Sequence, residues 1–388
     1  LAKSANKPSI TTDADLSHID DEYNPDSGKA TASQYEKGQL AFSLNQNLYD
    51  RSTRYDIESA DTSVQIAALQ LGIAKEDLIT NTVSAYLDVL SALDNRRLAE
   101  LQLAAIGEQL DLATQRLDVG LGTKTDQYDA QARFETANAD LIGAQNQVVN
   151  AQQALEALMN RSFQANPKQE MQVLDNEKVR FDLVNGDDWV NSVLLNNRAY
   201  KISLRQVERQ QVEVNRAKDA RWPKFGLFAG VNASNTTETA LLPSNDRQTW
   251  NAGIRGSMPI YLGGSIKLKQ QKAGYGLNAT RADSEQVRRD SDRLIRAARR
   301  GVETLNRQVE ARKQAVIAGK SALQSKEEGF KAGVTTNIDV LNAQRDLFQA
   351  GRDYLLASYD LVNAIVLLER AIGELDDDDV VRINRWLK

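Results

Sequence analysis

Two short polar segments contain the residues whose types and spacing suggest chemistry. Residues 118–131 read DVGLGTKTDQYDAQ, and residues 331–344 read KAGVTTNIDVLNAQ. In both segments a threonine is followed three residues later by an aspartate, as Thr123 with Asp126 and Thr336 with Asp339. A hydroxyl and a carboxylate at this spacing satisfy the free amide groups of a helix N-terminus, and the carboxylate also favours its positive end. The repeat therefore predicts two similar turns, each followed by a helix.

Cysteine and histidine, two side chains that carry much enzyme chemistry, are scarce in this chain. Cysteine is absent and His18 is the single histidine, so zinc sites, cysteine nucleophiles and histidine-based triads lack their components. The GKS tripeptide at 319–321 lacks the upstream glycine of a phosphate-binding loop, because residue 314 is glutamine. We therefore expect no catalytic site, no metal site and no cofactor.

The composition narrows the class of protein further. The 388 residues include 48 basic and 53 acidic side chains, with a net charge of −5, so we expect no nucleic-acid partner. No stretch approaches the 18 apolar residues of a membrane-spanning helix. The sequence has no initiator methionine and no signal peptide, so we expect any export signal to have been removed or omitted.

The positions of the prolines predict very long helices. Residues 51–160 and 265–372 contain no proline, which would interrupt a helix interior. Each stretch is divided by one of the two polar segments, which predicts helices over 51–118, 123–160, 265–330 and 336–372. A helix of about 65 residues is about 100 Å long. Such a length exceeds that of an ordinary domain and favours a coiled-coil-like assembly.

The two return helices share a strict heptad pattern, and many of its positions are alanine. Small residues let helices approach closely, and a seven-residue period favours left-handed supercoiling. A generic antiparallel coiled coil explains this pattern equally well. The seam residues are Phe134, Ala137, Leu141, Ala144, Val148, Ala151, Leu155 and Leu158, then Leu347, Ala350, Tyr354, Ala357, Leu361, Ala364, Leu368 and Ala371.

Four segments instead alternate between apolar and polar residues, at 9–19, 39–48, 225–232 and 250–260. This period is typical of a membrane β-strand, although a half-buried strand of a soluble protein gives the same pattern. The segments pair into two hairpins with loops near 20–33 and 233–248. Two hairpins cannot close a membrane barrel, so several chains would have to share one. Two chains would supply eight strands and three would supply twelve.

The repeat extends beyond the two polar segments. AKSANKP at 2–8 matches AKDARWP at 217–223, which ends a helix predicted to begin near Trp189. We therefore expect the chain to start near the end of a truncated first helix. The acidic run Asp376–Asp379 is expected to be solvated surface. The predicted division is 1–50 (helix end and first hairpin), 51–160 (first helical hairpin), 161–187 (mixed equatorial segment), 188–222 (short helix), 223–263 (second β-hairpin), 264–372 (second helical hairpin) and 373–388 (equatorial C-terminal segment).

Four segments of the chain resemble the TolC family of outer-membrane efflux ducts. SLNQNLYDRS at 43–52 and SMPIYLGGS at 257–265 are similar to its strand-to-helix junctions. RLDVGLGTKTD at 116–126 and GFKAGVTTNIDVLNAQRDL at 329–347 are similar to its two helix–turn–helix tips. The resemblance implies a mainly α fold with β-structure and two internal repeats per chain. It implies a homotrimer in which four strands per chain form a shared 12-stranded membrane β-barrel, continuous with a coiled-coil α-helical barrel.

The resemblance also implies a place and a function. The barrel would lie in the outer membrane of a Gram-negative bacterium, in contact with outer-membrane lipid, with the helical part in the periplasm. The chain would be the passive exit duct of a tripartite drug efflux pump or of a type I protein secretion system. Its partners would be a periplasmic adaptor (membrane fusion) protein and an inner-membrane transporter of the RND, ABC or MFS type. The alternative is a soluble coiled-coil scaffold or adhesin stalk.

In the TolC family, acidic residues just after the second tip form a constricting ring in the closed duct. Asp339 matches the first of these positions, and Asn342 stands where the second has aspartate. The resemblance therefore implies a pore ring of three carboxylates rather than six. Such a ring would bind cations more weakly. This role is compatible with helix capping by Asp339.

The family's closed state is also held by a tyrosine and an arginine of the second tip. Phe330 and Thr335 occupy those positions here, and their implied partners on the first tip are Thr125 and Asp126. Phe330 has no hydroxyl and Thr335 has no positive charge, so we expect a gate with different, weaker latching. The resemblance further implies that the exposed turns dock the adaptor, through Gly120, Leu121, Gly333 and Val334.

Overall fold

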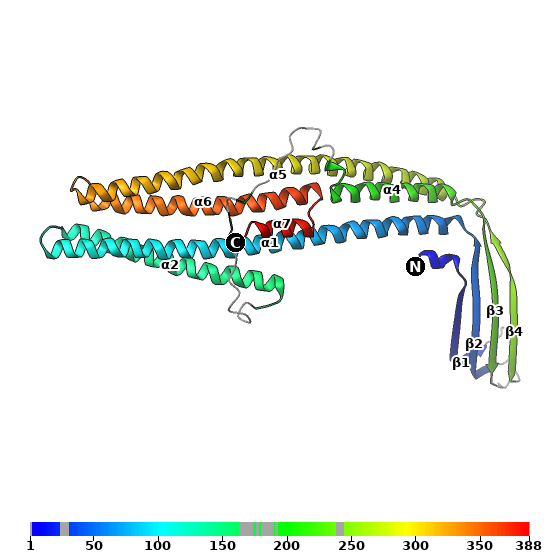
Figure 1. Cartoon of the computed structure of the whole chain (residues 1–388). Helices are drawn as coiled ribbons and strands as arrows, with labels where there is room; N and C mark the ends of the chain where they lie inside the picture. Colours follow the sequence, from blue (N-terminus) through cyan, green and yellow to red (C-terminus); the bar gives the residue numbers. More distant parts are fainter. Residues whose placement is uncertain are drawn as a thin grey trace. The chain divides into compact units, whose positions relative to one another are not determined.

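The computed structural model of the chain describes residues 2–23, 31–162, 174–175, 178–179, 190, 193–237 and 244–387 (Figure 1). These residues form two compact units. One contains Leu1–Ala68 and Ile202–Glu285, and the other contains Leu69–Lys201 and Gln286–Lys388. Among the described residues, no helix combines the length and the apolar character that crossing a membrane requires.

The first unit holds a four-stranded antiparallel sheet in the order β1-β2-β3-β4. The predicted strands are confirmed, but they run further into the predicted loops near 20–33 and 233–248; of those loops, residues 24–30 and 238–243 lie outside the described residues. The outer edges of β1 and β4 pair with no other strand of the described chain. The strands are β1 (Ser9–Tyr23), β2 (Thr31–Tyr49), β3 (Lys224–Thr236) and β4 (Asn245–Ser257).

The strand register aligns the apolar residues on one face of the sheet. Phe42 of β2 lies opposite Val231 of β3, which lies opposite Trp250 of β4. Leu44 lies between Ile10 and Ala229 in the same way, and residues two apart along a strand share a face. The side chain of Trp250 is 81% exposed. The predicted alternation is therefore confirmed, and it leaves one broad apolar face uncovered within a single chain.

The opposite face of the sheet is polar. Thr11 and Ser43 share a hydrogen bond of 2.7 Å across β1 and β2, and Ser43 lies opposite Gly230, which pairs with Asn251. The predicted fourth strand was too long at its end, since β4 ends at Ser257. Pro259 follows two residues later and has no backbone N–H to donate to a strand ladder.

Four long helices make two antiparallel hairpins, and their observed ends agree with the predicted ends to within one residue. Eight of the sixteen predicted seam residues are buried, including Ala137 and Ala144 of the first hairpin, and seven more are partly buried. Leu158 is an exception, because its side chain is 43% exposed. The first hairpin is α1 (Arg51–Asp118) with α2 (Lys124–Met159), and the second is α5 (Ser265–Lys331) with α6 (Asn337–Ile372).

The largest core lies in the second unit, where α1, α5 and α6 meet the C-terminal segment. Its fully buried side chains include Leu87 of α1, Ile295 of α5 and Ile365 of α6. The short helix α7 (Asp377–Arg385) covers it with Ile383. Leu174 and Leu387 form a β-bridge, so the described part of the segment 161–187 does pack against the C-terminal segment.

The acidic run at 376–379 is mostly exposed, as expected, and Asp376 and Asp379 also form the capping box at the start of α7. One sequence-based expectation is wrong in this region. The short helix predicted from near Trp189 is interrupted at 195–197, and α4 spans Arg198–Asp219. The helix starts again directly after Asn197. The Asn197 Oδ1 atom accepts from the backbone N–H of Tyr200 at 2.9 Å, and its Nδ2 atom donates to the carbonyl of Ala371 at 2.8 Å. An asparagine so placed caps a helix and fixes its start.

A buried ion pair ties α4 to α1. The Arg198 Nε atom donates to Glu76 Oε1 at 2.7 Å, and the Glu76 side chain is only 4% exposed. Gly72 makes room for this pair, because a Cβ atom at that position would lie 2.6 Å from Arg198 Nη1. A carboxylate so buried is stable only with its partner in place.

Substitution of Arg198 with alanine should therefore destabilise the protein. We expect a cost of about 3 kcal/mol, since the Glu76 carboxylate is left buried and unpaired. The melting temperature of the protein, followed by circular dichroism, measures the effect. Arg205→Ala is the matched control, because Arg205 pairs with Glu208 at 2.7 Å on the exposed side of α4, where such pairs contribute little. Equal losses in the two variants would contradict the expectation.

Candidate functional site at the two helical tips

The two turns that join the helices of each hairpin have the same backbone geometry. Gly120 and Gly333 both have a φ angle of 76°, in the left-handed region that strains residues with a side chain. The backbone N–H of Leu121 donates to the backbone carbonyl of Arg116 at 2.8 Å, and that of Val334 donates to the backbone carbonyl of Gly329 at 2.9 Å. Such bonds close a helix C-terminus with glycine in the left-handed position. The repeated segments thus specify one turn twice.

Each turn is followed by a complete capping box, which confirms the predicted helix starts. Thr336 Oγ1 accepts from the backbone N–H of Asp339 at 3.3 Å and donates to Asp339 Oδ2 at 2.7 Å. The backbone N–H of Thr336 also donates to Asp339 Oδ2, at 3.0 Å. Thr123 and Asp126 repeat this arrangement on the first tip. One carboxylate oxygen of each aspartate is therefore engaged in capping.

The second oxygen of Asp339 faces a positive charge. Lys326 Nζ lies 3.9 Å from Asp339 Oδ1. Hydrogen bonds from the Thr336 side chain and backbone lower the pKa of Asp339 below its ordinary value, and the Lys326 ammonium lowers it further. The carboxylate thus stays ionised at neutral pH, although a nearby lysine offsets part of its charge.

Each turn exposes one large apolar side chain. The side chains of Leu121 and Val334 are 80% and 76% exposed, and each follows a turn glycine. Large apolar side chains at the end of a helical hairpin suit contact with another protein. The docking role of Gly120, Leu121, Gly333 and Val334 remains a prediction.

Within one chain, the predicted gate residues contact groups other than their predicted partners. The guanidinium of Arg116 lies 4.2 Å from the centre of the Phe330 ring, and Thr335 Oγ1 donates to the Lys326 carbonyl at 3.0 Å. Thr125 is exposed. A cleft of about 190 Å³ lies between the two tips and is lined by Ala113, Arg116, Leu121, Gly122, Asp126, Phe330, Thr336 and Asn337.

Asp339 and Asn342 lie three residues apart on α6 and so share one side of that helix. Asn342 is engaged within the chain, because Arg133 Nη2 of α2 donates to its Oδ1 atom at 2.9 Å. Sequence reasoning missed Arg116, Arg133 and Lys326. The available signal was a basic side chain within about three helical turns of each tip.

The cap at Asp339 should make the start of α6 sensitive to acid. Its folded-state pKa lies below the ordinary value of 3.8, so its stabilisation is fully present above that pH and is lost as the pH falls through the folded-state value. Hydrogen-exchange protection of the first turn of α6 should therefore decrease at low pH. In Asp339→Asn this pH dependence should disappear, and an unchanged pH profile in that variant would contradict the assignment.

Removal of the capping hydroxyl should weaken the same turn at neutral pH. We expect Thr336→Ala to reduce hydrogen-exchange protection at the start of α6 about fivefold, because a threonine cap typically contributes about 1 kcal/mol. Thr80→Ala is a matched control, since its hydroxyl donates to the Glu76 carbonyl inside α1 at 2.8 Å and caps no helix. Protection at α6 that is retained in Thr336→Ala would show that the hydroxyl has no capping effect.

Comparison with known proteins identifies similar sequences over most of the chain. The chain is 28% identical over 353 residues to the outer membrane protein TolC of Vibrio cholerae serotype O1, covering 89% of this chain and 78% of the relative. It is 29% identical over 377 residues to the outer membrane efflux protein BepC of Brucella suis, covering 94% and 78%. It is 25% identical over 354 residues to the alkaline protease secretion protein AprF of Pseudomonas aeruginosa, covering 89% and 72%.

Solved structures share the fold at lower sequence identity. The Campylobacter jejuni CmeC outer membrane channel matches with a TM-score of 0.76 and 18% identity, covering 100% of this chain and 83% of that chain. The open state of the Neisseria gonorrhoeae MtrE outer membrane channel matches with a TM-score of 0.74 and 21% identity, covering 96% and 82%. The model of the family described as outer membrane efflux protein matches residues 1–161 and 189–374. The chain therefore belongs to the outer membrane efflux protein family.

Proposed function

We propose that three copies of this chain form the outer-membrane exit duct of an efflux or type I secretion system. The observation that carries this proposal is the open four-stranded sheet, with one apolar face and two unpaired edges. Backbone groups at a sheet edge cannot remain unpaired in lipid, so the sheet must close with other copies. Three copies supply a twelve-stranded barrel, in which the polar face lines the channel and the apolar face contacts lipid.

The substrate and the partners lie outside the chain's own chemistry. The similar relatives include a protein named for efflux and a protein named for protease secretion, so both kinds of export are compatible with this sequence. The duct is passive, and transport energy comes from an inner-membrane transporter joined through a periplasmic adaptor. The exposed turn residues Leu121 and Val334 are the proposed contact points for that adaptor.

The proposed constriction lies just inside the second tip. Three copies of Asp339 form the ring, and Asn342 adds no charge to it. Two features moderate the negative potential of this ring. One oxygen of Asp339 is engaged with Thr336, and the other lies 3.9 Å from Lys326 Nζ. A ring of this kind binds multivalent cations, but less strongly than six free carboxylates.

Block of the channel by a trivalent cation tests the ring. Asp339→Asn removes three carboxylates from the trimer, and we expect the blocking concentration to rise about tenfold. Asp126→Asn is the matched control, because Asp126 makes the same capping box on the first tip and is not assigned to the ring. The measurement is single-channel current in a planar bilayer. Identical block of both variants and the unmodified channel would remove Asp339 from the proposed ring.

Extraction and conductance separate the duct from the alternative of a soluble scaffold. The duct should require detergent for extraction and should conduct ions in a planar bilayer. Capture of an adaptor and an inner-membrane transporter from the native membrane would then identify the export system. A protein that is soluble without detergent and electrically silent would contradict the proposal.

A further inference from the structure

Strands and helices of the first unit are joined at one end of the sheet (Figure 1). Phe225 of β3 lies there, opposite Tyr49 at the end of β2 and opposite Gly256 near the end of β4. Within a few residues of these strand ends, α1 and α5 begin and α4 ends. The 3-10 helix that ends at Asn6 lies there too, because its Asn6 carbonyl accepts from Gln46 Nε2 at 2.7 Å.

Basic side chains are concentrated at this end of the sheet. The chain as a whole has a net charge of −5. The stretches that connect the strands at the other end, 18–37 and 233–248, contain seven acidic and three basic side chains. The charge therefore changes sign along the sheet. Eleven basic and three acidic side chains occur in the four stretches at the helical end, which are 1–8, 50–56, 216–224 and 258–272.

Most of these cations have no acidic partner in the described part of the chain. The three acidic side chains at this end are already engaged in ion pairs, which are Asp50 with Lys224, Asp219 with Arg51, and Asp56 with Arg216. Seven basic side chains are exposed and form no ion pair among the described residues. We call these seven the basic collar, which consists of Lys7, Arg54, Lys218, Arg221, Lys267, Lys269 and Lys272.

The basic collar is densest at the start of α5. Lys267, Lys269 and Lys272 lie within the first eight residues of that helix, and its first turn contains no acidic side chain. The first turn of α1 carries Arg54 and also contains no acidic side chain. Like charges at such short separations repel one another. Closure of the sheet by identical copies would bring several collars to one level and raise the positive potential further.

Exposed apolar side chains lie beside the basic collar. The segment between β4 and α5 contains Ile260 and Tyr261, whose side chains are 95% and 81% exposed. Trp222, next to Arg221, is 45% exposed. Aromatic rings beside lysine and arginine are typical of a protein surface at the headgroup level of a membrane. Long basic side chains can lay their aliphatic stems along apolar surface there and keep their charges among the headgroups.

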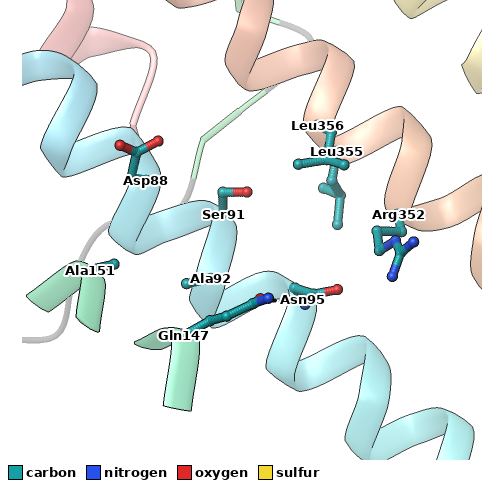
Figure 2. Close-up of a pocket in the computed structure, with 9 residues that line it drawn as sticks. All are labelled: Asp88, Ser91, Ala92, Asn95, Gln147, Ala151, Arg352, Leu355 and Leu356. Atoms are coloured by element: carbon teal, nitrogen blue, oxygen red, sulfur yellow. Dashed lines mark hydrogen bonds between the residues drawn. The ribbon is translucent and has the colours of Figure 1, made fainter. Parts of the chain in front are cut away.

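Polar regions of the second unit lack this excess of one sign. The cleft in Figure 2, of about 460 Å³, is lined by both Asp88 and Arg352. In the arginine-rich middle of α5, Arg293 pairs with Asp290 at 3.1 Å. Surfaces that carry both signs give no strong preference for an anion. The basic collar is therefore the better candidate for an anionic partner.

We propose that the basic collar binds anionic phospholipid headgroups in the membrane leaflet on the helical side of the sheet. Its side chains contact the lipid phosphates, and Ile260 and Tyr261 contact the acyl chains. This binding fixes the depth of the sheet, because a shift in one direction separates the collar from the phosphates and a shift in the other buries its charges in hydrocarbon. The collar rests on the proposed function in that the sheet must lie in the membrane.

Lipid retention measures this preference directly. The detergent-solubilised protein is mixed with equal amounts of phosphatidylglycerol and phosphatidylcholine, which share a phosphate group but differ in net charge. Native mass spectrometry then counts the molecules of each lipid that remain bound. We expect a preference of about tenfold for phosphatidylglycerol, because each basic side chain near an anionic lipid surface strengthens binding about fivefold and a headgroup in the collar meets more than one.

Two triple variants make the result specific. Lys267→Gln, Lys269→Gln and Lys272→Gln together remove the densest part of the collar and should reduce the preference to about twofold. The matched control removes three exposed lysines toward the tips and should keep the wild-type preference. No loss in the first variant, or an equal loss in both, would overturn the proposal. The control substitutions are Lys124→Gln, Lys320→Gln and Lys331→Gln.

A smaller variant protects the test against misfolding of the first triple variant. Lys218→Gln with Arg221→Gln removes two collar charges around the end of α4 and should give an intermediate preference. If the triple variant does not fold, this variant decides, and a wild-type preference in it would overturn the collar.

Two competition measurements distinguish the lipid from other anions. Inorganic phosphate at constant ionic strength should not displace phosphatidylglycerol, and displacement would replace the proposed lipid surface with a site for free phosphate. A wild-type protein without lipid preference that instead binds purified peptidoglycan through the collar lysines would also overturn the proposal.

Conductance separates this proposal from the proposed duct. A channel that conducts in a phosphatidylcholine bilayer but shows no preference for phosphatidylglycerol contradicts only the collar. A protein that retains phosphatidylglycerol with the expected preference but does not conduct contradicts only the duct.

Discussion

The rest of the structure depends on one constraint, which is that backbone N–H and C=O groups cannot remain unpaired in lipid. The sheet of this chain exposes an apolar face that includes Phe42, Val231 and Trp250. Its two edge strands pair with nothing else in the described chain. A lone copy in a membrane would leave the backbone groups of both sheet edges unpaired. Closure with identical neighbours pairs these edges, and it explains why each chain needs only four strands.

The long helices pack closely because small side chains line the seam between them. Alanines such as Ala137 and Ala144 are buried along the seam, so neighbouring helices approach closely without bulky residues between them. Large apolar side chains are instead concentrated in the core around Leu87, Ile295 and Ile365. Packing is therefore dense at that level and light toward the tips. A duct that must open at one end benefits from this gradient, because the moving end has little core to lose.

Sequence reasoning predicted most of the fold because its strongest signals are local. The proline-free stretches and the two polar segments that divide them predicted the helix ends to within one residue, and the two Thr-x-x-Asp segments predicted capping boxes that the structure contains. The break before α4 was missed because its cause is tertiary, since Asn197 caps that helix while donating to Ala371. The capping role of Asp376 was missed because a run of four acidic residues resembles solvated surface.

The site was predicted less completely than the fold. Phe330 was identified by its place in the second tip, but its contact with Arg116 joins residues that are distant in sequence, and no local pattern pairs them. The same is true of Arg133 with Asn342. Arg116, Phe330 and Asn342 lie in the segments that resemble the family's tips, whereas Arg133 lies just beyond them. The fold of the second unit brings the two hairpins side by side, and only this arrangement pairs Arg116 with Phe330 and Arg133 with Asn342.

The mass of the detergent-solubilised complex tests the central claim most directly. One chain has a mass of 43.0 kDa, and native mass spectrometry resolves the number of copies after the detergent is removed in the gas phase. The account predicts three copies, which supply twelve strands to a closed barrel. A monomer would leave the edges of β1 and β4 unpaired, and a dimer would close an eight-stranded barrel, so either result would contradict it.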